Sequence, residues 1–287
     1  MDVELLSGAC GAEIAGIDLR DTSDDNIKII KDLLFEHKVI FFRNQDITHQ
    51  EQIDLSKCFG PIEKHPYVKG LEDHPEILRV IKEPQEQNAW GAGWHSDVSY
   101  NPEPTMATIL KSVEIPPVGG DTMFANTELA YDTLDKNLKI QIEGKTAIHS
   151  SLGPGAFLEN YDSMISNEKT DVYTNEHPIV RTNPDSNRKT LFVNRYFTIQ
   201  IVRMNKEDSD TLLKKLFDHQ ERLDFTCRFK WTPNAVAIWD NRSVLHYGIA
   251  DFFPNRSLGY RRVLDRIAVR GEKPFLMNVL KVFKCGN

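Results

Sequence analysis

Short segments with strand character make up most of the regular structure that this sequence predicts. They are rich in β-branched and aromatic residues and are bounded by turn residues. In chain order they are EILRVI (76–81), TMATILKSV (105–113), DTMFAN (121–126), PIVRT (178–182), TLFVN (190–194), TCRFKW (226–231), AVAIWD (235–240) and RVLDRIAVR (262–270). Many short strands with few helices are typical of a double-sheet jelly roll or of a barrel. The sequence therefore predicts a mainly β fold with flanking helices, an α+β arrangement around such a core.

Helices are expected mainly before these strands. Residues 24–36 carry apolar side chains at helical spacing and lead into a short strand, VIFF, at 39–42. THQE at 48–51 is a capping-box pattern, in which a Thr and the Glu three residues later can bond each other's backbone N–H groups. It predicts a second helix that ends before Gly60. Further helical segments are expected at 127–143 and 208–221.

The domain organisation follows from what the chain does not contain. It has 287 residues, no internal repeat and no linker rich in Pro, Gly and Ser, so we expect a single domain over 1–287. Residues 151–176 are rich in Gly, Asn, Ser and Asp. Long loops in compact domains are often lids, and we expect this one to cover a site.

Charge and composition limit the partners. A net charge of −7 and an isoelectric point of about 5.7 argue against a nucleic-acid surface, which needs clustered Lys and Arg. The apolar runs are too short to span a membrane, and the N-terminus shows no secretory signal pattern. The four cysteines are scattered, which fits a reducing cytoplasm. We expect a cytoplasmic protein with a small-molecule partner; the sequence leaves a homo-oligomer open.

A histidine and an aspartate stand two apart in GWHSDVSY (93–100). In an extended segment residues i and i+2 project from one face, so His95 and Asp97 would point the same way. His246, after the strand AVAIWD, could supply a third ligand. Two histidines and one carboxylate on one face of a metal are the ligands of non-haem Fe(II) oxygenases.

Plainer interpretations compete with this one. An HxD pair alone is weak evidence, and a lone histidine such as His246 is more often a surface or core residue. Zinc hydrolases also use two histidines and a carboxylate, but the HExxH pattern is absent here. Trp94 and Trp239 lie beside the ligands in sequence and could line or support the pocket, but core packing is the role that we expect.

Two further motifs favour a metal site that also binds a carboxylate. RRVLDR (261–266) lies on a predicted strand and can aim a guanidinium inward, where it would bind a carboxylate through two hydrogen bonds. PPVGGDT (116–122) supplies a tight Gly-Gly turn and the hydroxyl of Thr122. The alternatives are a solvated strand face for the arginines and an ordinary strand start for Thr122.

Taken together, WHSDVSY…PPVGGDT…HPIVRT…LFVN…AIWDNR…H…RR…DR resembles the TauD/TfdA family of Fe(II)- and 2-oxoglutarate-dependent dioxygenases, from about residue 5 to residue 275. The resemblance implies a double-stranded β-helix (jelly-roll) core. It implies that His95, Asp97 and His246 bind Fe(II) and that Thr122 binds the distal carboxylate of 2-oxoglutarate.

The resemblance leaves the choice of arginine to the alignment. Counting back from RGEKPF puts Arg262 on the 2-oxoglutarate position and Arg266 on a substrate-side position, and the two share one face of a strand. Counting forward from His246 favours Arg256 or Arg261 instead, because the chain carries a short insertion around 254–260. We follow the backward count.

The substrate side is implied by three residues. EKHPYV (63–68) resembles the segment that gives the family's taurine-oxidising member a histidine for the anionic group, so His65 joins Arg266 and Val98 as a predicted substrate contact. NAWGAGW (88–94) lacks the polar residues that contact taurine, which argues against taurine itself.

The implied activity is hydroxylation of a small organic anion, such as a sulfonate or a sulfate ester. It would be coupled to O2 consumption and to conversion of 2-oxoglutarate to succinate and CO2. The alternatives are the same chemistry on an aryloxy acid or an amino-acid-derived carboxylate, and a non-catalytic jelly-roll protein that binds a metal or small molecule.

Overall fold

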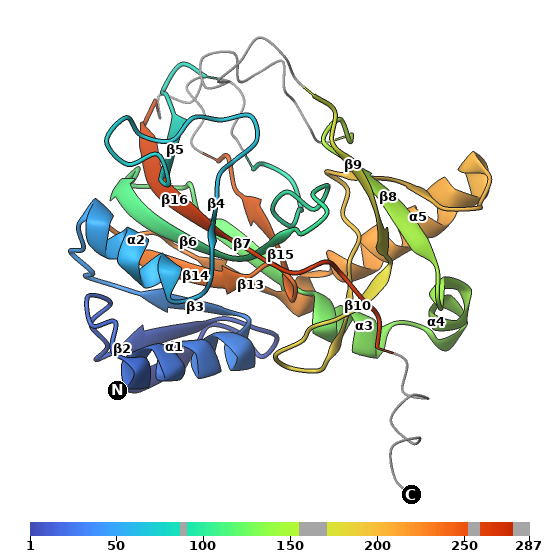
Figure 1. The fold of residues 1–287 in the computed structure, drawn as a ribbon, viewed down its shortest axis with the longest axis horizontal. Coiled ribbons are helices and arrows are strands. Elements are labelled where there is room, and N and C mark those ends of the chain that lie inside the picture. Colours follow the sequence, from blue (N-terminus) through green and yellow to red (C-terminus); the bar gives the residue numbers. More distant parts are fainter. Residues whose placement is uncertain (87–90, 155–170, 252–258, 278–287) are drawn as a thin grey trace, which may run out of the picture.

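The computed structural model describes residues 1–86, 91–154, 171–251 and 259–277. One large sheet forms the body of the molecule (Figure 1), with strand order β1-β2-β3-β14-β6-β16-β4 and β5 paired to β16. Its strands are β1 (Asp2–Leu5), β2 (Ala12–Ala15), β3 (Val39–Phe42), β4 (Ile62–Glu63), β5 (Leu78–Lys82), β6 (Thr105–Glu114), β14 (Val236–Asp240) and β16 (Arg262–Arg270). All of these pairings are antiparallel except β2 with β3.

A smaller sheet packs against the large one. Its order is β13-β7-β15, with β13 (Thr226–Phe229), β7 (Thr122–Asn126) and β15 (Val244–Gly248). Phe41 of the large sheet stacks on Phe229 of the small one at 4.0 Å between ring centroids, and Phe41 also meets Phe124 edge to face. Two sheets closed over an aromatic core form a mainly β molecule of the expected jelly-roll type.

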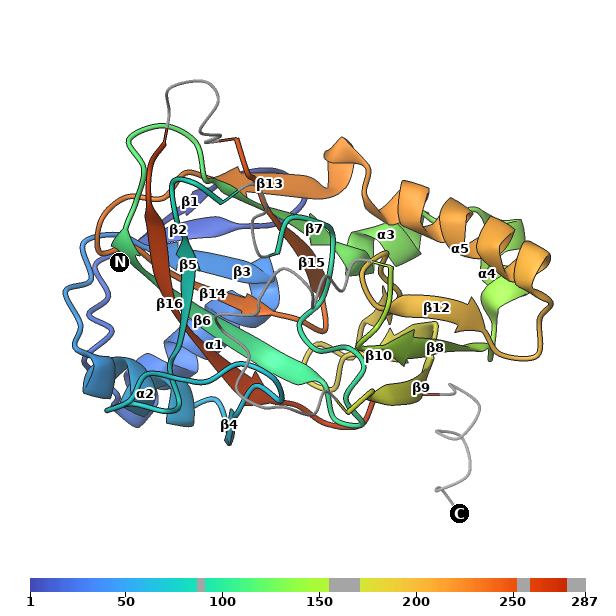
Figure 2. The same cartoon turned by 90° about the horizontal axis from the view of Figure 1, so that it is seen from above.

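A lateral lobe lies to one side of the sheets (Figure 2). It holds the sheet β12-β8-β9 and the pair β10-β11. The strands are β8 (Thr146–Ser150), β9 (Thr174–Pro178), β10 (Val180–Thr182), β11 (Lys189–Leu191) and β12 (Thr198–Ile201), and the helices are α3 (Thr127–Thr133), α4 (Lys136–Ile142) and α5 (Lys206–Gln220). Apolar residues of these elements form their own core cluster.

The N-terminal helices match the sequence pattern closely. α1 (Asp24–His37) buries Ile27, Ile30, Leu33 and Leu34 against the large sheet. α2 (His49–Lys57) starts at Thr48, whose side chain accepts from the Glu51 N–H while the Glu51 carboxylate accepts from the Thr48 N–H, so the predicted capping box is present.

The segment 127–143 holds two helices. They are separated at Leu134 and Asp135, and the Asp135 carboxylate caps α4 by accepting from the N–H groups of Asn137 and Leu138. A capping aspartate inside an apolar-periodic segment ends one helix and begins another.

The predicted loop at 151–176 is shorter than expected. Residues 174–176 already belong to β9, which pairs with β8. Residues 155–170 lie outside the described part of the chain, so the predicted lid remains a prediction. In the described segments no helix is both long enough and apolar enough to cross a bilayer.

Candidate metal and co-substrate site

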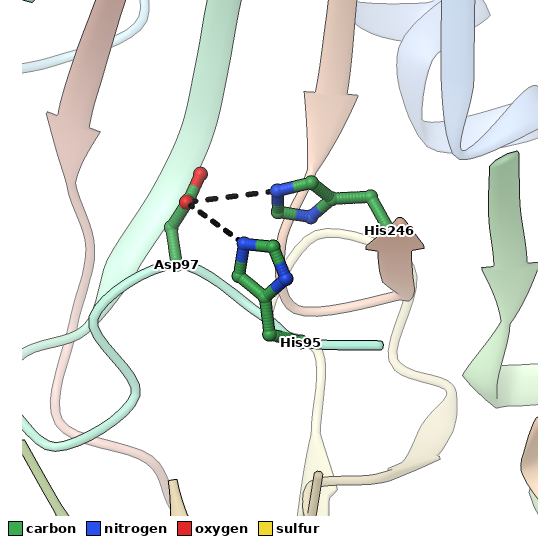
Figure 3. A group of neighbouring side chains, drawn as sticks. All are labelled: His95, Asp97 and His246. Carbon is green, nitrogen blue, oxygen red and sulfur yellow. Dashed lines mark ion pairs between the residues drawn. The ribbon is translucent and has the colours of Figure 1, made fainter. Parts of the chain in front are cut away.

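Three side chains converge between the two sheets (Figure 3). His95 forms an isolated antiparallel bridge with His246 of β15, through His95 N–H to His246 O (3.1 Å) and His246 N–H to His95 O (2.8 Å). Asp97 Oδ1 lies 3.9 Å from His95 Nε2 and 3.6 Å from His246 Nε2. One ligand atom from each residue lies within 4.8 Å of the other two, so the three can reach one metal ion.

His95 and Asp97 point into the same cavity, as expected, although Asp97 lies in a turn and not in a strand. Asp97 begins a turn over residues 97–100, closed by the Asn101 N–H to Val98 O hydrogen bond of 2.8 Å. Val98 has a φ of 39°, in the left-handed region that β-branched residues avoid. Backbone strain of this kind is common at functional sites.

Both histidines are held in the state that a metal requires. His95 Nδ1 lies 2.7 Å from the carbonyl oxygen of Gly93, which fixes the ring proton on Nδ1 and leaves the lone pair of Nε2 toward Asp97. Burial lowers the pKa of His95 and holds that of His246 well below its ordinary value. Neutral imidazoles are the metal-binding form.

Asp97 is oriented through its second oxygen. Thr108 donates its hydroxyl to Asp97 Oδ2 at 2.6 Å, and Arg266 Nη2 lies 3.1 Å from the same atom. Asn241 accepts the Asp97 backbone N–H at 3.1 Å and donates to Thr108 at 2.9 Å. Burial alone would raise the pKa of Asp97, but Arg266, the two histidines and Thr108 together hold it well below its ordinary value. Oδ1 therefore stays available as an anionic ligand.

These residues fit an Fe(II) ion. Two neutral nitrogens and one carboxylate oxygen form a compact group with protein behind it and a cavity in front, which leaves further coordination positions for other ligands. A closed structural zinc site would instead surround the metal with protein ligands.

Arg262 opens β16 and points into the same cavity. It is buried, donates from Nε to Gly120 O at 3.0 Å and lies 3.4 Å through Nη2 from Thr122 Oγ1. Among the described residues it has no ion-pair partner. Burial lowers its pKa to about 10, against the opposing effect of Asp121 and Asp251. A buried guanidinium with no carboxylate partner is costly and is well matched to an anionic ligand.

The turn in front of Arg262 explains the Gly-Gly motif. Gly119 and Gly120 have φ values of 79° and 74°, and a Cβ on Gly120 would lie 3.1 Å from Arg262 Cδ. Thr122, two residues after Gly120, accepts from Trp231 Nε1 at 2.9 Å as well as from Arg262. Its hydroxyl therefore retains its own proton for an acceptor in the cavity.

The alternative arginines do not share this position. Arg261 lies on the outer side, where it pairs with Glu83 and Glu114 at 3.0 Å each. Arg256 lies outside the described residues.

The predicted substrate contacts line the same cavity as the metal-site residues. The lining residues include His65, Val98, Arg266, Arg262, Thr122, His95, Asp97, His246, Tyr100, Tyr196, Phe197 and Trp239. His65 Nδ1 accepts from the backbone N–H groups of Tyr67 and Val68 at 3.2 Å, which places the ring proton on Nε2. Burial, with Arg266 nearby, lowers the pKa of His65 to about 3, so this Nε2–H is a neutral donor.

Sequence reasoning missed several functional neighbours. Thr108 and Asn241 support Asp97, and Tyr100, Tyr196 and Phe197 form apolar walls of the cavity. The strand pattern placed Thr108 on β6, but no local signal distinguishes it from any other buried threonine. Trp239 packs in the core, as expected, and also lines the cavity, and its indole N–H donates to Asn241 at 3.1 Å.

Comparison with known proteins gives consistent matches across the chain. The family model described as "Taurine catabolism dioxygenase TauD, TfdA family" matches residues 2–267. An alkylsulfatase of Acinetobacter baylyi is 34% identical, over 95% of this chain and 86% of that protein. An alpha-ketoglutarate-dependent sulfate ester dioxygenase of Pseudomonas putida is 35% identical, over 96% of this chain and 91% of that protein. The crystal structure of a taurine dioxygenase from Burkholderia xenovorans superposes with a TM-score of 0.80 at 33% identity, covering 95% of this chain and 90% of that one.

Proposed function

This chain belongs to the TauD/TfdA family and is an Fe(II)- and 2-oxoglutarate-dependent dioxygenase, and from this premise we propose that it hydroxylates a small organic sulfate ester or sulfonate. The observation that carries the proposal is the placement of Arg266 and His65 on the cavity wall beside the metal-site residues. Relatives named for sulfate esters support this substrate class.

We propose that His95 Nε2, Asp97 Oδ1 and His246 Nε2 hold the Fe(II). Arg262 and the Thr122 hydroxyl bind the distal carboxylate of 2-oxoglutarate, because they offer buried donors that no carboxylate of the described residues uses. With 2-oxoglutarate and O2, the bound iron supplies the oxidising chemistry that replaces a C–H bond of the substrate by C–OH, with succinate and CO2 as co-products. The protein positions the reactants and excludes bulk water.

The anionic head of the substrate is proposed to meet Arg266 and the Nε2–H of His65. Arg266 already has a counter-charge within the protein, because Asp97 Oδ2 lies 3.1 Å from its Nη2. A substrate anion is therefore not needed to neutralise Arg266. Arg266 and His65 both line the cavity next to the proposed iron ligands, so a bound head group would present its neighbouring carbon to the metal.

The tail of the substrate is proposed to lie against apolar side chains. Val98, Tyr100 and Phe197 line the cavity, and the Tyr100 and Phe197 rings are 5.0 Å apart between centroids. Such walls suit an alkyl or aryl group better than the charged amino group of taurine.

A matched substrate series tests the proposal. We expect alkyl sulfates and sulfonates to drive succinate formation with Fe(II) and O2, while the neutral alcohols of the same chain length do not. Arg266→Ala should raise the KM for the anions, and Arg270→Ala, on the exposed end of the same strand, should leave it unchanged.

Equal turnover of neutral and anionic analogues, unaltered in Arg266→Ala, would disprove the proposed anion site. Preference for aryloxy acids or amino-acid-derived carboxylates would support those alternatives. Turnover with zinc and without O2 would indicate a hydrolase, and binding without turnover would indicate a non-catalytic protein.

We also propose that the protein works in the cytoplasm. Cys10, Cys58 and Cys227 are free thiols, which fits a reducing compartment.

A further inference from the structure

Tyr67 connects the His65 loop to a distant part of the chain. Its backbone N–H donates to His65 Nδ1 at 3.2 Å, so it helps to hold that ring and its proton on Nε2. The residue is 6% exposed and therefore buried. Tyr67 does not line the cavity, whereas His65 does.

The Tyr67 hydroxyl is anchored at two points. It donates to the backbone oxygen of Asp171 at 2.6 Å and shares a second hydrogen bond with Ser151 Oγ at 2.7 Å. Ser151 and Tyr173 bond each other, through Ser151 N–H to Tyr173 O (2.9 Å) and Tyr173 N–H to Ser151 Oγ (3.1 Å). These bonds extend the β8–β9 pair beyond its last residues. The single Tyr67 hydroxyl thus joins the His65 loop to both segments of this extension, at Ser151 and at Asp171.

The Tyr67 ring also supports the cavity wall from behind. It belongs to one apolar cluster with Val98 and Tyr100, which do line the cavity. The Tyr67 and Tyr100 ring centroids are 6.4 Å apart. Tyr67 thus packs behind the cavity wall without lining the cavity itself.

We propose that Tyr67 is a positioning residue for the anion site: its hydroxyl fixes the His65 loop to Ser151 and Asp171 and thereby sets the affinity for the anionic head of the substrate. This inference rests on the proposed function, in which His65 donates to that head.

Tyr67→Phe tests the inference because it removes the hydroxyl and keeps the ring. We expect the KM for the anionic substrate to rise about fivefold, which is the order expected for one lost intramolecular hydrogen bond. The kcat, the KM for 2-oxoglutarate and the affinity for Mn(II) should stay within about twofold. Tyr173→Phe is the matched control, because the Tyr173 hydroxyl makes no hydrogen bond within the described residues and its ring lies next to that of Tyr67.

The same change in a His65→Ala background identifies the route. If Tyr67 acts through His65, Tyr67→Phe should have no further effect on KM once the imidazole is absent. A Tyr67→Phe effect of equal size in both backgrounds would overturn the inference, as would an unchanged KM in Tyr67→Phe. A uniform loss of kcat together with weaker 2-oxoglutarate binding would instead show a general packing role and would also overturn it.

Failure of the proposed function gives a different result. If His65→Ala alone leaves the KM for the anion unchanged, His65 is not the anion donor. If His65→Ala raises KM while Tyr67→Phe does not, the anion site stands and only the positioning role of Tyr67 is refuted.

Discussion

Arg262 is a buried cation. Within the residues that the structure describes, its hydrogen-bond partners are the Gly120 carbonyl and the Thr122 hydroxyl. Its neighbour Arg261 has two carboxylate partners on the exposed side. The two adjacent arginines therefore differ in the cost of binding an anion. Arg261 would give up existing ion pairs. Arg262, which has no ion pair among the described residues, would gain one.

Arg262→Ala should weaken 2-oxoglutarate binding on the order of a hundredfold, because truncating one partner of a buried charge pair costs several kcal/mol. Calorimetric titration of 2-oxoglutarate into the Mn(II)-loaded protein measures this without turnover. Arg261→Ala is the matched control and should bind as the wild type does. A hundredfold loss in Arg261→Ala with normal binding in Arg262→Ala would show that the backward alignment is off by one residue.

At the scale of elements, β16 separates two functions on its two faces. Arg262, Leu264 and Arg266 line the cavity, whereas Asp265 between them points to the other face. There its carboxylate accepts from Arg79 Nε at 2.7 Å and lies 3.0 Å from His49 Nε2. Helix α2 thus supports β16 from behind, through His49 and through Gln52, which donates to the Asp265 carbonyl at 3.0 Å.

Loss of the α2 cap should therefore affect stability more than ligand binding. Thr48→Ala removes the acceptor for the Glu51 N–H and should lower the free energy of unfolding by about 1 kcal/mol. Urea denaturation measures the change, with Gln50→Ala in the same exposed first turn as the control. The affinity for 2-oxoglutarate should be unaffected. A large loss of affinity in Thr48→Ala would mean that the cap controls the position of β16 directly.

At the scale of the whole molecule, two buried histidines join the lateral lobe to the turn that carries Asp97. His149 of β8 lies 3.0 Å through Nδ1 from Ser99 Oγ, and His177 of β9 lies 2.9 Å through Nε2 from the Asn101 carbonyl. Burial lowers the pKa of His149 to about 3 and that of His177 to about 4, from an ordinary value of 6.5. Both are neutral when the protein is folded at neutral pH.

Stability should consequently fall as the pH is lowered through 6.5. Below that value the unfolded chain protonates both histidines while the folded protein does not, so the unfolded state binds more protons and is favoured. The loss should grow until the pH reaches about 3 to 4, where the folded state would protonate too. Urea denaturation midpoints measured at about pH 7.5, 6 and 5 should decline in that order, because these values bracket the pH range in which unperturbed histidines titrate. A constant midpoint across this range would contradict the buried neutral pair.

The features that the sequence determined are local or periodic. Residue alternation on β16 places Arg262 and Arg266 on one face, and Thr48 with Glu51 predicts the start of α2, because such patterns depend only on near neighbours. The tertiary structure alone decided how the Asp97 carboxylate is held, because its partners Thr108 and Arg266 come from strands β6 and β16. It likewise decided the role of Tyr67, whose partners stand 84 and 104 residues away. Contacts across such separations are set by how the sheets pack, which no short stretch of sequence specifies.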